Sequence, residues 1–396
     1  MKTIEHVCLK GKKVLIRVDF NVPINENLEI SDDTRMVAAI PTIQKVVNDG
    51  GRAIIISHLG RPKNGFEEKY SLKHTVNHLS ILLDKRVQFS NDCIGKKTLD
   101  LISKMSDGDV IVLENLRFYN EEKSGDEYFS KKLAELADVY VNDAFGVAHR
   151  AHASTAIITK FFTKNKYFGL LLSKEISVLK NVLKKCDRPF TAIIGGSKIT
   201  GKIDVIKSLF KKVDNLIVGG GMAYTFIESM GGSVGKSLVE KDKLTLAKQL
   251  IKEAKKNNVN LILPIDSLNA DSFSDDSKTT QSDIFMIDEN YMGLDLGDRS
   301  VAKFCRIIKS SKTIIWNGPM GVFEMKSFER GTREIGEAIC WATKNGAFSL
   351  VGGGDSIAAL QKFKLEKRVS YVSTGGGAML EFLEGKDLPG IKAVRY

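Results

Sequence analysis

The sequence has 396 residues, which at roughly 150 residues per domain predicts two or three domains, each able to bury a core of its own. Hydrophobic residues make up 43% of the chain and charged residues 27%, with 7 prolines and 34 glycines. These values are typical of a folded globular protein, so they exclude a single small module, a disordered chain and a collagen-like chain.

The balance of 59 basic and 48 acidic residues leaves a formal charge of +11. This charge suits nucleic acid, a membrane surface or a small polyanionic substrate, and by itself it does not choose among them. The longest uncharged stretch, residues 215–227, is interrupted by glycines and is shorter than the ~18 apolar residues of a membrane span. Because the first residues lack a signal-peptide pattern and the 5 cysteines form no C-x-x-C pair, we expect a cytosolic chain without structural disulfides.

Short β-branched segments alternate with amphipathic segments of helical length in the first half of the chain. The pattern predicts strands over 14–20, 53–57, 110–114 and 139–142, and helices over 35–47, 72–83 and 128–136. Such alternation is typical of parallel strands joined by crossover helices.

A second series of strands follows a connecting segment. Residues 173–185 have apolar residues at helical spacing and end before Pro189, so we predict a connecting helix there. Strands are then expected over 191–194, 216–218, 260–263, 313–316, 348–351 and 371–373. The sequence therefore predicts two α/β domains of similar size.

Polar residues follow the predicted strands of the first half. Ligands of open parallel sheets bind beyond the carboxyl ends of the strands, so these residues should meet at one edge. The ordinary role of any single arginine is a surface salt bridge. Four arginines that reach the same edge of the sheet from separate segments favour a site for a small anion instead, because a guanidinium group binds phosphate or carboxylate through two parallel hydrogen bonds. The residues of this expected anion site are Asp19, Asn21, His58, Arg61, Arg117, His149 and Arg150, with Arg35 from the following helix.

The histidines can be interpreted in two ways. His58 could equally be a hydrogen-bonded structural histidine. Four other histidines lack an acidic or cysteine partner at the spacing of a metal site, so they do not indicate zinc. They are His74, His78, His149 and His152.

The predicted strands of the second half end mostly in glycine. Glycine lets backbone N–H groups approach phosphate oxygens closely, and a helix N-terminus favours negative charge. One such end is best explained as a turn, but several in one domain favour nucleotide phosphates. The ends begin at Gly195, Gly219, Asn317, Gly352 and Gly375, and Lys198, Lys202 and Asp355 accompany them. Asp355 could hold Mg²⁺, which prefers carboxylate oxygen and retained water.

Standard nucleotide motifs do not match. Residues 231–237 end like a P-loop, but Met230 occupies the place of its first glycine. The glycine triplets lack the last glycine of G-x-G-x-x-G, which disfavours a dinucleotide-dependent oxidoreductase as one alternative. Another alternative, a basic nucleic-acid-binding protein, would need a basic face with interleaved aromatic residues, whereas the arginines here lie at the ends of predicted buried strands.

Taken together, these segments resemble the phosphoglycerate kinase family over essentially the whole chain. The resemblance rests on ten motifs in order: Arg17-Val-Asp-Phe-Asn-Val-Pro, Ser57-His-Leu-Gly-Arg-Pro, Glu114-Asn-Leu-Arg-Phe, Asn142-Asp-Ala-Phe, Ala148-His-Arg-Ala-His, Gly235-Lys-Ser-Leu-Val-Glu, Tyr291-Met-Gly-Leu-Asp, Trp316-Asn-Gly-Pro-Met-Gly-Val-Phe-Glu, Val351-Gly-Gly-Gly-Asp-Ser and Ser373-Thr-Gly-Gly-Gly-Ala.

The resemblance implies a site for each substrate. The residues implied for phosphoglycerate are Asp19, Asn21, Arg35, His58, Leu59, Gly60, Arg61, Arg117 and Arg150, with Arg35 nearest the transferred group. Those implied for the nucleotide are Lys202, Gly293, Glu324, Gly353, Gly354, Asp355 and Ser356, with Asp355 on the Mg²⁺ ion. Residues suited to stabilise the transferred phosphoryl group are Arg35, Lys198, Lys202, Gly354 and Gly377.

It also implies a fold and a way of working. We expect two Rossmann-like three-layer domains with parallel sheets, residues 1–170 for phosphoglycerate and 187–380 for the nucleotide, joined by a helix over 171–186, with a tail over 381–396 returning to the first domain. The expected enzyme is a cytoplasmic monomer that moves a phosphoryl group between 1,3-bisphosphoglycerate and MgADP by hinge closure, with neither nucleic acid nor membrane as a partner. Three residues depart from the family pattern, namely Gly201, Asp298 and Met379, and none of them carries chemistry.

Overall fold

The computed structural model describes residues 2–63, 65–184 and 186–395, and the chain folds into two compact units. Unit 1 contains the chain up to Val178 and from Asp387 onward, and unit 2 contains Leu179–Lys386. Within the described residues each unit has a parallel sheet of 6 strands, which confirms the predicted α/β fold with two parallel-sheet domains.

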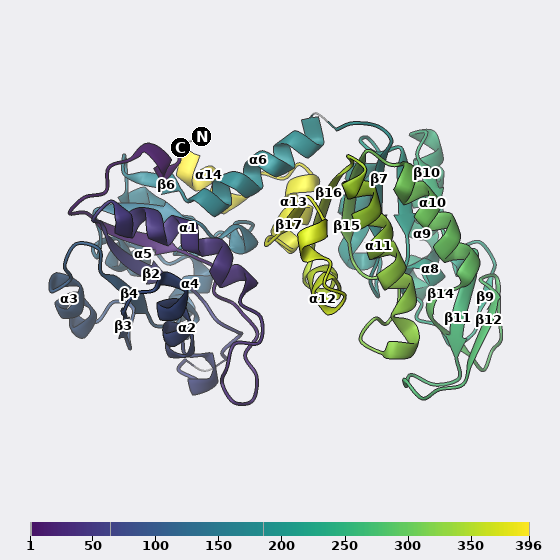
Figure 1. Cartoon of the computed structure of the whole chain (residues 1–396), viewed down its shortest axis with the longest axis horizontal. Helices are drawn as coiled ribbons and strands as arrows, with labels where there is room; N and C mark the ends of the chain where they lie inside the picture. Colours follow the sequence, from purple (N-terminus) through teal and green to yellow (C-terminus); the bar gives the residue numbers. More distant parts are fainter. Residues whose placement is uncertain (1, 64, 185, 396) are drawn as a thin grey trace. The chain divides into compact units, whose positions relative to one another are not determined.

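The sheet of unit 1 has the strand order β3-β4-β2-β1-β5-β6. Its strands are β1 (Lys13–Arg17), β2 (Arg52–Ile56), β3 (Val87–Ser90), β4 (Val110–Leu113), β5 (Val139–Asn142) and β6 (Lys166–Phe168). β4 and β5 are buried at every position, as expected for parallel strands covered on both faces. The helices of this unit are α1 (Thr34–Asn48), α2 (Lys73–Leu83), α3 (Lys96–Ser103), α4 (Asn120–Ser124), α5 (Glu127–Ala134) and α14 (Pro389–Arg395) (Figure 1).

One face of this sheet forms the main core cluster of unit 1. Val14 and Ile16 of β1 pack with Ile55 of β2, Val112 of β4 and Val141 of β5, and all are fully buried. They occupy alternate positions along their strands, so they share one face of the sheet. The core therefore fixes the strands side by side and brings their carboxyl ends to one edge.

The main sheet of unit 2 has the order β10-β8-β7-β15-β16-β17. These strands are β7 (Phe190–Ile194), β8 (Asn215–Val218), β10 (Asn260–Ile262), β15 (Thr313–Asn317), β16 (Phe348–Gly352) and β17 (Tyr371–Ser373). From β7 the chain builds outward to β10 and then returns to build in the other direction from β15. In such a doubly wound sheet the point between β7 and β15, where the direction reverses, is the expected place for a ligand.

The helices of unit 2 are α7 (Ile203–Leu209), α8 (Met222–Ser229), α9 (Leu244–Lys256), α10 (Asp298–Ser310), α11 (Arg330–Lys344), α12 (Gly354–Lys362) and α13 (Gly377–Leu383). Helices α10 and α11 lie side by side (Figure 1). The indole of Trp316 on β15 is fully buried in the core between sheet and helices, and its Nε1 donates to the carbonyl of Gly318 at 2.8 Å.

Unit 2 also contains strands that the sequence pattern did not predict. β11 (Asp266–Ala270), β12 (Thr279–Asp283) and β14 (Met292–Leu296) form an antiparallel sheet, and β9 (Ser233–Val234) pairs with β13 (Met286–Ile287). The sequence pattern predicted no strand between residues 218 and 260 or between residues 263 and 313, so these additional strands were missed. The β12 sequence Thr-Thr-Gln-Ser-Asp is almost entirely exposed and polar, so it has no hydrophobic alternation to reveal it.

Helix α6 (Leu170–Lys184) runs from one unit to the other, since the division falls between Val178 and Leu179. Helix α14, near the end of the chain, packs beside β6 of unit 1 (Figure 1). There the N–H of Gly390 donates to the carbonyl of Ala148 at 2.8 Å, and Lys166 Nζ donates to the carbonyl of Ala393 at 3.0 Å. The chain from Asp387 onward is thus fastened to unit 1.

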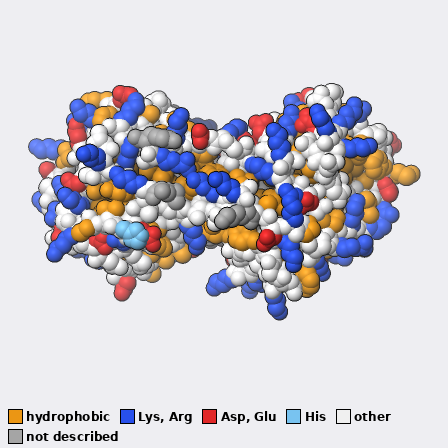
Figure 2. Space-filling model, turned by 90° about the horizontal axis from the view of Figure 1, so that it is seen from above, with side chains coloured by type: hydrophobic (Ala, Val, Ile, Leu, Met, Phe, Trp, Pro, Cys, Tyr) orange, Lys and Arg blue, Asp and Glu red, His pale blue; other side chains and the backbone are white. Residues whose placement is uncertain are grey.

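The positive charge of the chain is widely distributed. Figure 2 shows Lys and Arg side chains scattered over the visible face of each unit. Among the described residues, no helix is both long and apolar enough to cross a membrane.

Candidate functional site

The loop after β1 carries two of the expected anion-binding residues. Asp19 is almost fully buried, and its Oδ2 accepts a hydrogen bond from Arg35 Nη1 at 3.2 Å. Arg35, in the first turn of α1, also donates to the carbonyl of Asn21 at 3.0 Å. The guanidinium is therefore held against the β1 loop by two acceptors, while a third of its side chain remains exposed.

The loop after β2 is tied to its neighbours on both sides. The N–H of Gly60 donates to Asn21 Oδ1 at 2.8 Å, and the carbonyl of Gly60 accepts from Arg117 Nη1 at 2.5 Å. Leu59 exchanges two hydrogen bonds with the side chain of Asn115, at 2.7 and 3.2 Å. These bonds hold the ends of β1, β2 and β4 together as one rigid rim.

The electrostatics of this rim show that the arginines lie close together. Burial lowers the pKa of His58 well below its usual value, and the positive charges of Arg17, Arg117, Arg35 and Arg150 lower it further. Burial, then Arg150 and Arg17, lowers the pKa of the Arg117 guanidinium to about 10. Such an excess of positive charge favours an anion as the natural ligand.

The structure does not bring every predicted residue equally into this cluster. Arg150 lies beside it and donates from Nε to His149 Nε2 at 3.2 Å. Arg61 is exposed and has no hydrogen bond or ion pair with other described residues. It is therefore close to the rim in sequence, one residue after Gly60, but is not fixed to it.

Sequence reasoning missed Arg17 as a member of this cluster. Arg17 is the last residue of β1, is 1% exposed and lies within 3.2 Å of His58. It also missed the buried Glu122 and Ser154, which are linked to Arg17 as described below. A signal was present, since an arginine inside a buried parallel strand needs polar partners at that depth.

The glycine-rich ends of unit 2 meet where β7 and β15 lie side by side. The N–H of Gly195 donates to the carbonyl of Asn317 at 2.9 Å, and that of Gly196 to the carbonyl of Pro319 at 3.0 Å. A β-carbon on Gly195 would lie 2.0 Å from the carbonyl oxygen of Pro319, so no larger residue fits there. The two loops therefore touch backbone to backbone.

A cavity of about 530 Å³ opens at this reversal point of the sheet. Its apolar walls include Tyr224, Phe273, Leu294 and Val322, which suit a planar base. Of the residues predicted for the nucleotide it contains three, Gly293, Glu324 and Asp355. The aromatic and aliphatic walls were not predicted from sequence, because they come from separate segments: Tyr224 from α8, Leu294 from β14, and Phe273 and Val322 from loops.

Lys202 lies at the edge of this region. Its Nζ donates to Asn317 Oδ1, and burial lowers its pKa to about 8, against the opposing effect of Asp355. The Asp355 carboxylate, in the first turn of α12, is exposed and has no hydrogen bond or ion pair with other described residues. Lys198 is likewise exposed in the described part of the chain, without a bonded partner.

Two of the predicted glycines are required by their surroundings. Gly353 precedes α12 at φ +102°, and a β-carbon there would lie 2.5 Å from Asn317 Nδ2. A β-carbon on Gly293 would lie 2.0 Å from the hydroxyl of Tyr224. Gly354 and Gly377 are exposed at the first turns of α12 and α13. Ser356 is buried, and its hydroxyl accepts from the N–H of Gly318 at 2.6 Å, so it shapes the loop.

The three residues that depart from the family pattern each have a place in unit 2. Asp298 begins α10 and pairs with Arg330 of α11. Met379 is fully buried, and its sulfur lies 2.4 Å from where a β-carbon on Gly352 would be, so it fills the space beneath that glycine. Gly201 is exposed, and a β-carbon placed on it would have no neighbouring atom within 4 Å.

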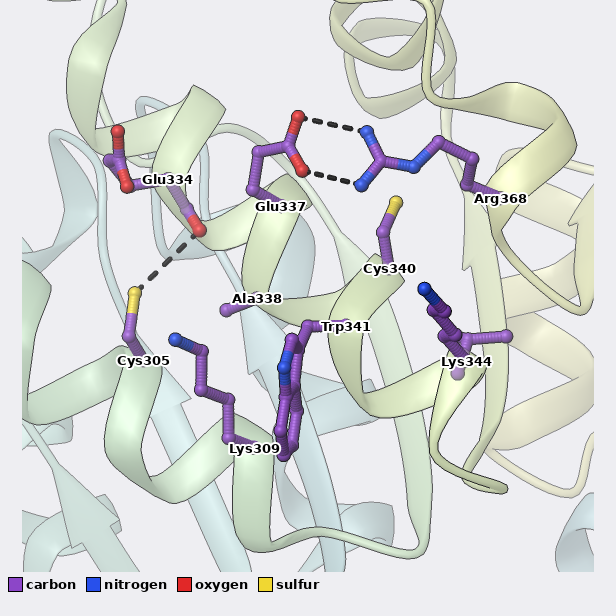
Figure 3. A pocket seen from close by; sticks show the side chains of 10 residues that line it. Cys305, Lys309, Glu334, Glu337, Ala338, Cys340, Trp341, Lys344 and Arg368 are labelled. Carbon is purple, nitrogen blue, oxygen red and sulfur yellow. Dashed lines mark hydrogen bonds and ion pairs between the residues drawn. The ribbon is translucent and has the colours of Figure 1, made fainter.

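A larger cavity of about 620 Å³ lies elsewhere in unit 2, between α10, α11 and the short helix over Glu366–Arg368. Figure 3 shows that two pairs of its lining residues are bonded to each other, Glu337 with Arg368 and Cys305 with Glu334. Arg368 and Glu337 form two parallel hydrogen bonds of 2.9 and 2.7 Å, and Cys305 Sγ lies 3.6 Å from the carbonyl of Glu334. Lys309 lies over the Trp341 ring at 5.7 Å. These mutually paired groups make it a weaker site candidate than the cavity at the sheet reversal.

Among the described residues, no group of three or more His, Cys, Asp or Glu is arranged to hold a metal ion.

Comparison with known proteins gives a consistent result. A family model described as phosphoglycerate kinase matches residues 4–386. The chain is 51% identical over 417 residues to a phosphoglycerate kinase of Porphyromonas gingivalis, covering 99% of this chain and 100% of that protein, and 48% identical over 393 residues to one of Chlorobium phaeobacteroides, covering 99% of each. The solved phosphoglycerate kinase of Coxiella burnetii superposes with a TM-score of 0.87 at 42% identity, covering 99% of this chain and 98% of that one.

Proposed function

The chain belongs to the phosphoglycerate kinase family, and from that premise we propose which of its residues carry out the reaction. The enzyme reversibly transfers a phosphoryl group from 1,3-bisphosphoglycerate to ADP, giving 3-phosphoglycerate and ATP, a step of glycolysis and gluconeogenesis. The observation that carries our residue assignment is the cluster of Arg17, Arg35, Arg117 and Arg150 around His58.

We assign the phosphoglycerate to this cluster. The carboxylates of Asp19 and Glu122 oppose the charge of Arg117 there, but burial, Arg150 and Arg17 outweigh them and the pKa of Arg117 is still lowered, so an anionic ligand restores the balance of charge. Asn21, Leu59 and Gly60 complete the rim through their backbone and amide groups. Arg61, exposed and unpaired among the described residues, is available to close over the ligand.

We assign the nucleotide to the cavity at the sheet reversal of unit 2. The apolar walls would hold the base, with Gly293 and Glu324 beside it. The phosphates would extend toward Gly353, Gly354 and Asp355 at the start of α12, where backbone N–H groups and the helix dipole favour negative charge. Ser356 supports that loop from beneath.

Transfer then depends on positioning and on charge. The acceptor in the reverse direction is a carboxylate, whose pKa is about 4 in ordinary carboxyl groups, so it is already ionised at neutral pH and needs no general base. The groups that would stabilise the charge on the transferred phosphoryl group are Arg35, Lys198, Lys202 and the amides of Gly354 and Gly377. All of these groups carry positive charge or donate N–H groups, and none is a general base, as expected for a transfer that needs no base.

Mg²⁺ fits the residues present. The Asp355 carboxylate is exposed, unpaired among the described residues and next to the cavity, and Mg²⁺ is commonly held by one or two carboxylates together with substrate phosphates. When bound there, Mg²⁺ would neutralise phosphate charge. Asp355 would hold the ion, and Lys202 would hold the phosphate that it faces.

The two substrates occupy different units, so the reaction requires the units to close. We propose that closure bends the chain near α6, which runs through the division between the units. We propose further that the enzyme acts as a cytoplasmic monomer and has neither nucleic acid nor a membrane as partner.

Replacing Arg35 tests the assignment. Arg35→Ala should lower kcat for ATP formation at least about 100-fold, because it removes charge stabilisation made in the transition state, and should leave the circular dichroism spectrum unchanged. The matched control is Arg86→Ala, an exposed arginine of unit 1 without a bonded partner in the described residues, which should keep wild-type activity. A near-normal kcat for Arg35→Ala would contradict the role.

A further inference from the structure

We infer that Arg17 is a positioning residue that holds His58 as its neutral tautomer with hydrogen on Nε2, so that His58 meets the phosphoglycerate as a hydrogen-bond donor and not as a cation. This inference rests on the proposed substrate site. It deepens that proposal, because it states what the buried Arg17 of the cluster does: it acts on the substrate through its contact with His58.

The Arg17 guanidinium is fixed at three of its nitrogen atoms. Nε donates to Ser154 Oγ at 2.9 Å, Nη1 donates to the carbonyl of Val18, and Nη2 lies 3.2 Å from His58 Nδ1. The side chain is 1% exposed, so water does not compete for these contacts. The planar fork therefore has little freedom to turn away from His58.

The identity of the donor decides the tautomer. A guanidinium has only N–H donors and no acceptor, so the nitrogen that it contacts must accept. His58 Nδ1 therefore carries no hydrogen, and a neutral ring places it on Nε2. Nε2 has no hydrogen-bond partner among the described residues. It is also not completely buried, so a ligand atom can approach it. Its N–H can thus donate to a ligand oxygen.

The surroundings disfavour a protonated ring. Arg17, Arg35, Arg117 and Arg150 surround it, and together with burial they lower the pKa of His58 well below the usual value. The opposing charge is Asp19, whose Oδ1 is 3.7 Å from Nδ1, and that carboxylate already accepts from Arg35. A second positive charge on the imidazole would add repulsion with every guanidinium around it.

A buried relay fixes Arg17 from behind. The Ser154 hydroxyl accepts from Arg17 and donates to Glu122 Oε1 at 2.6 Å, and the Ser154 N–H donates to Glu122 Oε2 at 2.9 Å. Glu122 and Ser154 are fully buried. The relay links the end of β1 to α4 and to the loop that carries Arg150, so Arg17 is held by two separate parts of the rim.

The wild-type enzyme provides the first test, without any substrate. The chain has 6 histidines, and the ring signals of His58 can be assigned by their loss in His58→Gln. Nitrogen-15 NMR should show an unprotonated Nδ1 and a protonated Nε2, with no titration as the pH passes about 6.5, the ordinary pKa of histidine. A hydrogen on Nδ1, or a ring that titrates near that pH, would overturn the inference.

The role of Arg17 is tested by Arg17→Lys, which keeps the positive charge beside Glu122 but removes the planar fork. Signals of both His58 tautomers should appear in the folded variant, whereas an unchanged tautomer would show that Arg17 does not set it. If the variant does not fold, Ser154→Ala replaces it, because this change removes the acceptor of Arg17 Nε and so loosens the guanidinium. It should give the same mixture of tautomers, and an unchanged tautomer would again show that Arg17 does not set it.

The donor role is tested with two amides of different reach. Glutamine can place an N–H near the Nε2 position, whereas the shorter asparagine places one near Nδ1. His58→Asn should therefore raise KM for 3-phosphoglycerate about tenfold, the effect of one hydrogen bond to a charged group, and His58→Gln should raise it several-fold less. Equal losses would overturn the donor role. Absence of ATP formation by the wild-type enzyme would refute the proposed function while leaving the NMR result intact.

Discussion

Single side chains in both units show the same physical feature, which is positive charge that is buried without enough negative charge to balance it. In unit 1 the pKa values of His58 and Arg117 are lowered by burial and by neighbouring guanidinium groups. In unit 2 burial lowers the pKa of Lys202. The electrostatic repulsion among these buried positive charges is unfavourable in the empty protein. A bound polyanion relieves it, because the ligand supplies the missing negative charge.

Lys202 gives a pH prediction. Its pKa of about 8 means that it is a cation below that pH and loses its proton as the pH rises through it. Because kcat/KM reports the free enzyme, kcat/KM for ADP should decline above about pH 8. In Lys202→Arg, whose guanidinium stays protonated, that decline should move to higher pH even if the overall rate is lower. A profile that is identical in the two proteins would contradict the role of Lys202.

The sequence predicted which residues meet at the rim of unit 1 where they follow a recognisable strand. Asp19, His58 and Arg117 follow β1, β2 and β4, and the structure brings them together because parallel strands end at one edge. Arg17 was missed because it lies inside the strand. There the sequence pattern predicts the strand itself but does not indicate which residues contact a given side chain. The walls of the nucleotide cavity, such as Tyr224 and Phe273, come from different segments and carry no local signal.

At the scale of helices and strands, buried side-chain acceptors fasten the loops that carry the site. Glu114, after β4, is 4% exposed, and its carboxylate accepts from Ser71 Oγ at 2.7 Å, from the N–H of Leu72 at 2.9 Å and from the N–H of Asn115 at 2.7 Å. It thereby joins the start of α2 to the loop that positions Arg117. Fixed loops reduce the loss of entropy when substrate binds.

Glu114 therefore gives a stability prediction. Glu114→Ala leaves three buried donors without an acceptor, so we expect the free energy of unfolding of unit 1 to fall by about 2 kcal/mol. Urea unfolding followed by circular dichroism measures it. Glu26→Ala is the control, because Glu26 is exposed and has no bonded partner in the described residues, and it should stay within about 0.5 kcal/mol of wild type. Equal stability of the two variants would contradict the role of Glu114.

Elements were predictable where hydrophobic patterning was strong. The central strands of both parallel sheets form buried β-branched runs, and β5 matches its predicted bounds of 139–142. The edge strands β3 and β6 have the sequences Val-Gln-Phe-Ser and Lys-Tyr-Phe, are only partly buried and were not predicted. β1 ends at Arg17, whereas the pattern extended it to residue 20, because the apolar Val18 and Phe20 are buried in the loop after the strand. The antiparallel sheet of unit 2 was not predicted, since burial of Asn269 and Ser267 in β11 depends on tertiary contacts.

At the scale of the whole molecule, we propose that each unit binds one substrate. α6 belongs to both units, since its residues up to Val178 pack with unit 1 and those from Leu179 with unit 2. A helix that is continuous through the division can transmit the binding of one substrate to the other unit.

Domain closure gives a prediction for scattering. The radius of gyration from small-angle X-ray scattering should decrease when 3-phosphoglycerate and a non-hydrolysable ATP analogue are both bound, because only then do the two sets of charge-stabilising groups share one phosphoryl group. Each ligand alone should have a smaller effect. An unchanged radius with both ligands bound would remove the closure proposal without affecting the assignment of each half-site.

Amide chemical-shift mapping of the whole enzyme tests the central assignment most directly. With 3-phosphoglycerate alone, the largest shifts should fall on residues after β1, β2 and β4 of unit 1, including Asn21 and Gly60. With MgADP alone, they should fall on unit 2, at Gly293 and at the start of α12. Shifts from MgADP centred on the arginine rim, or from 3-phosphoglycerate centred on the glycine loops, would contradict it.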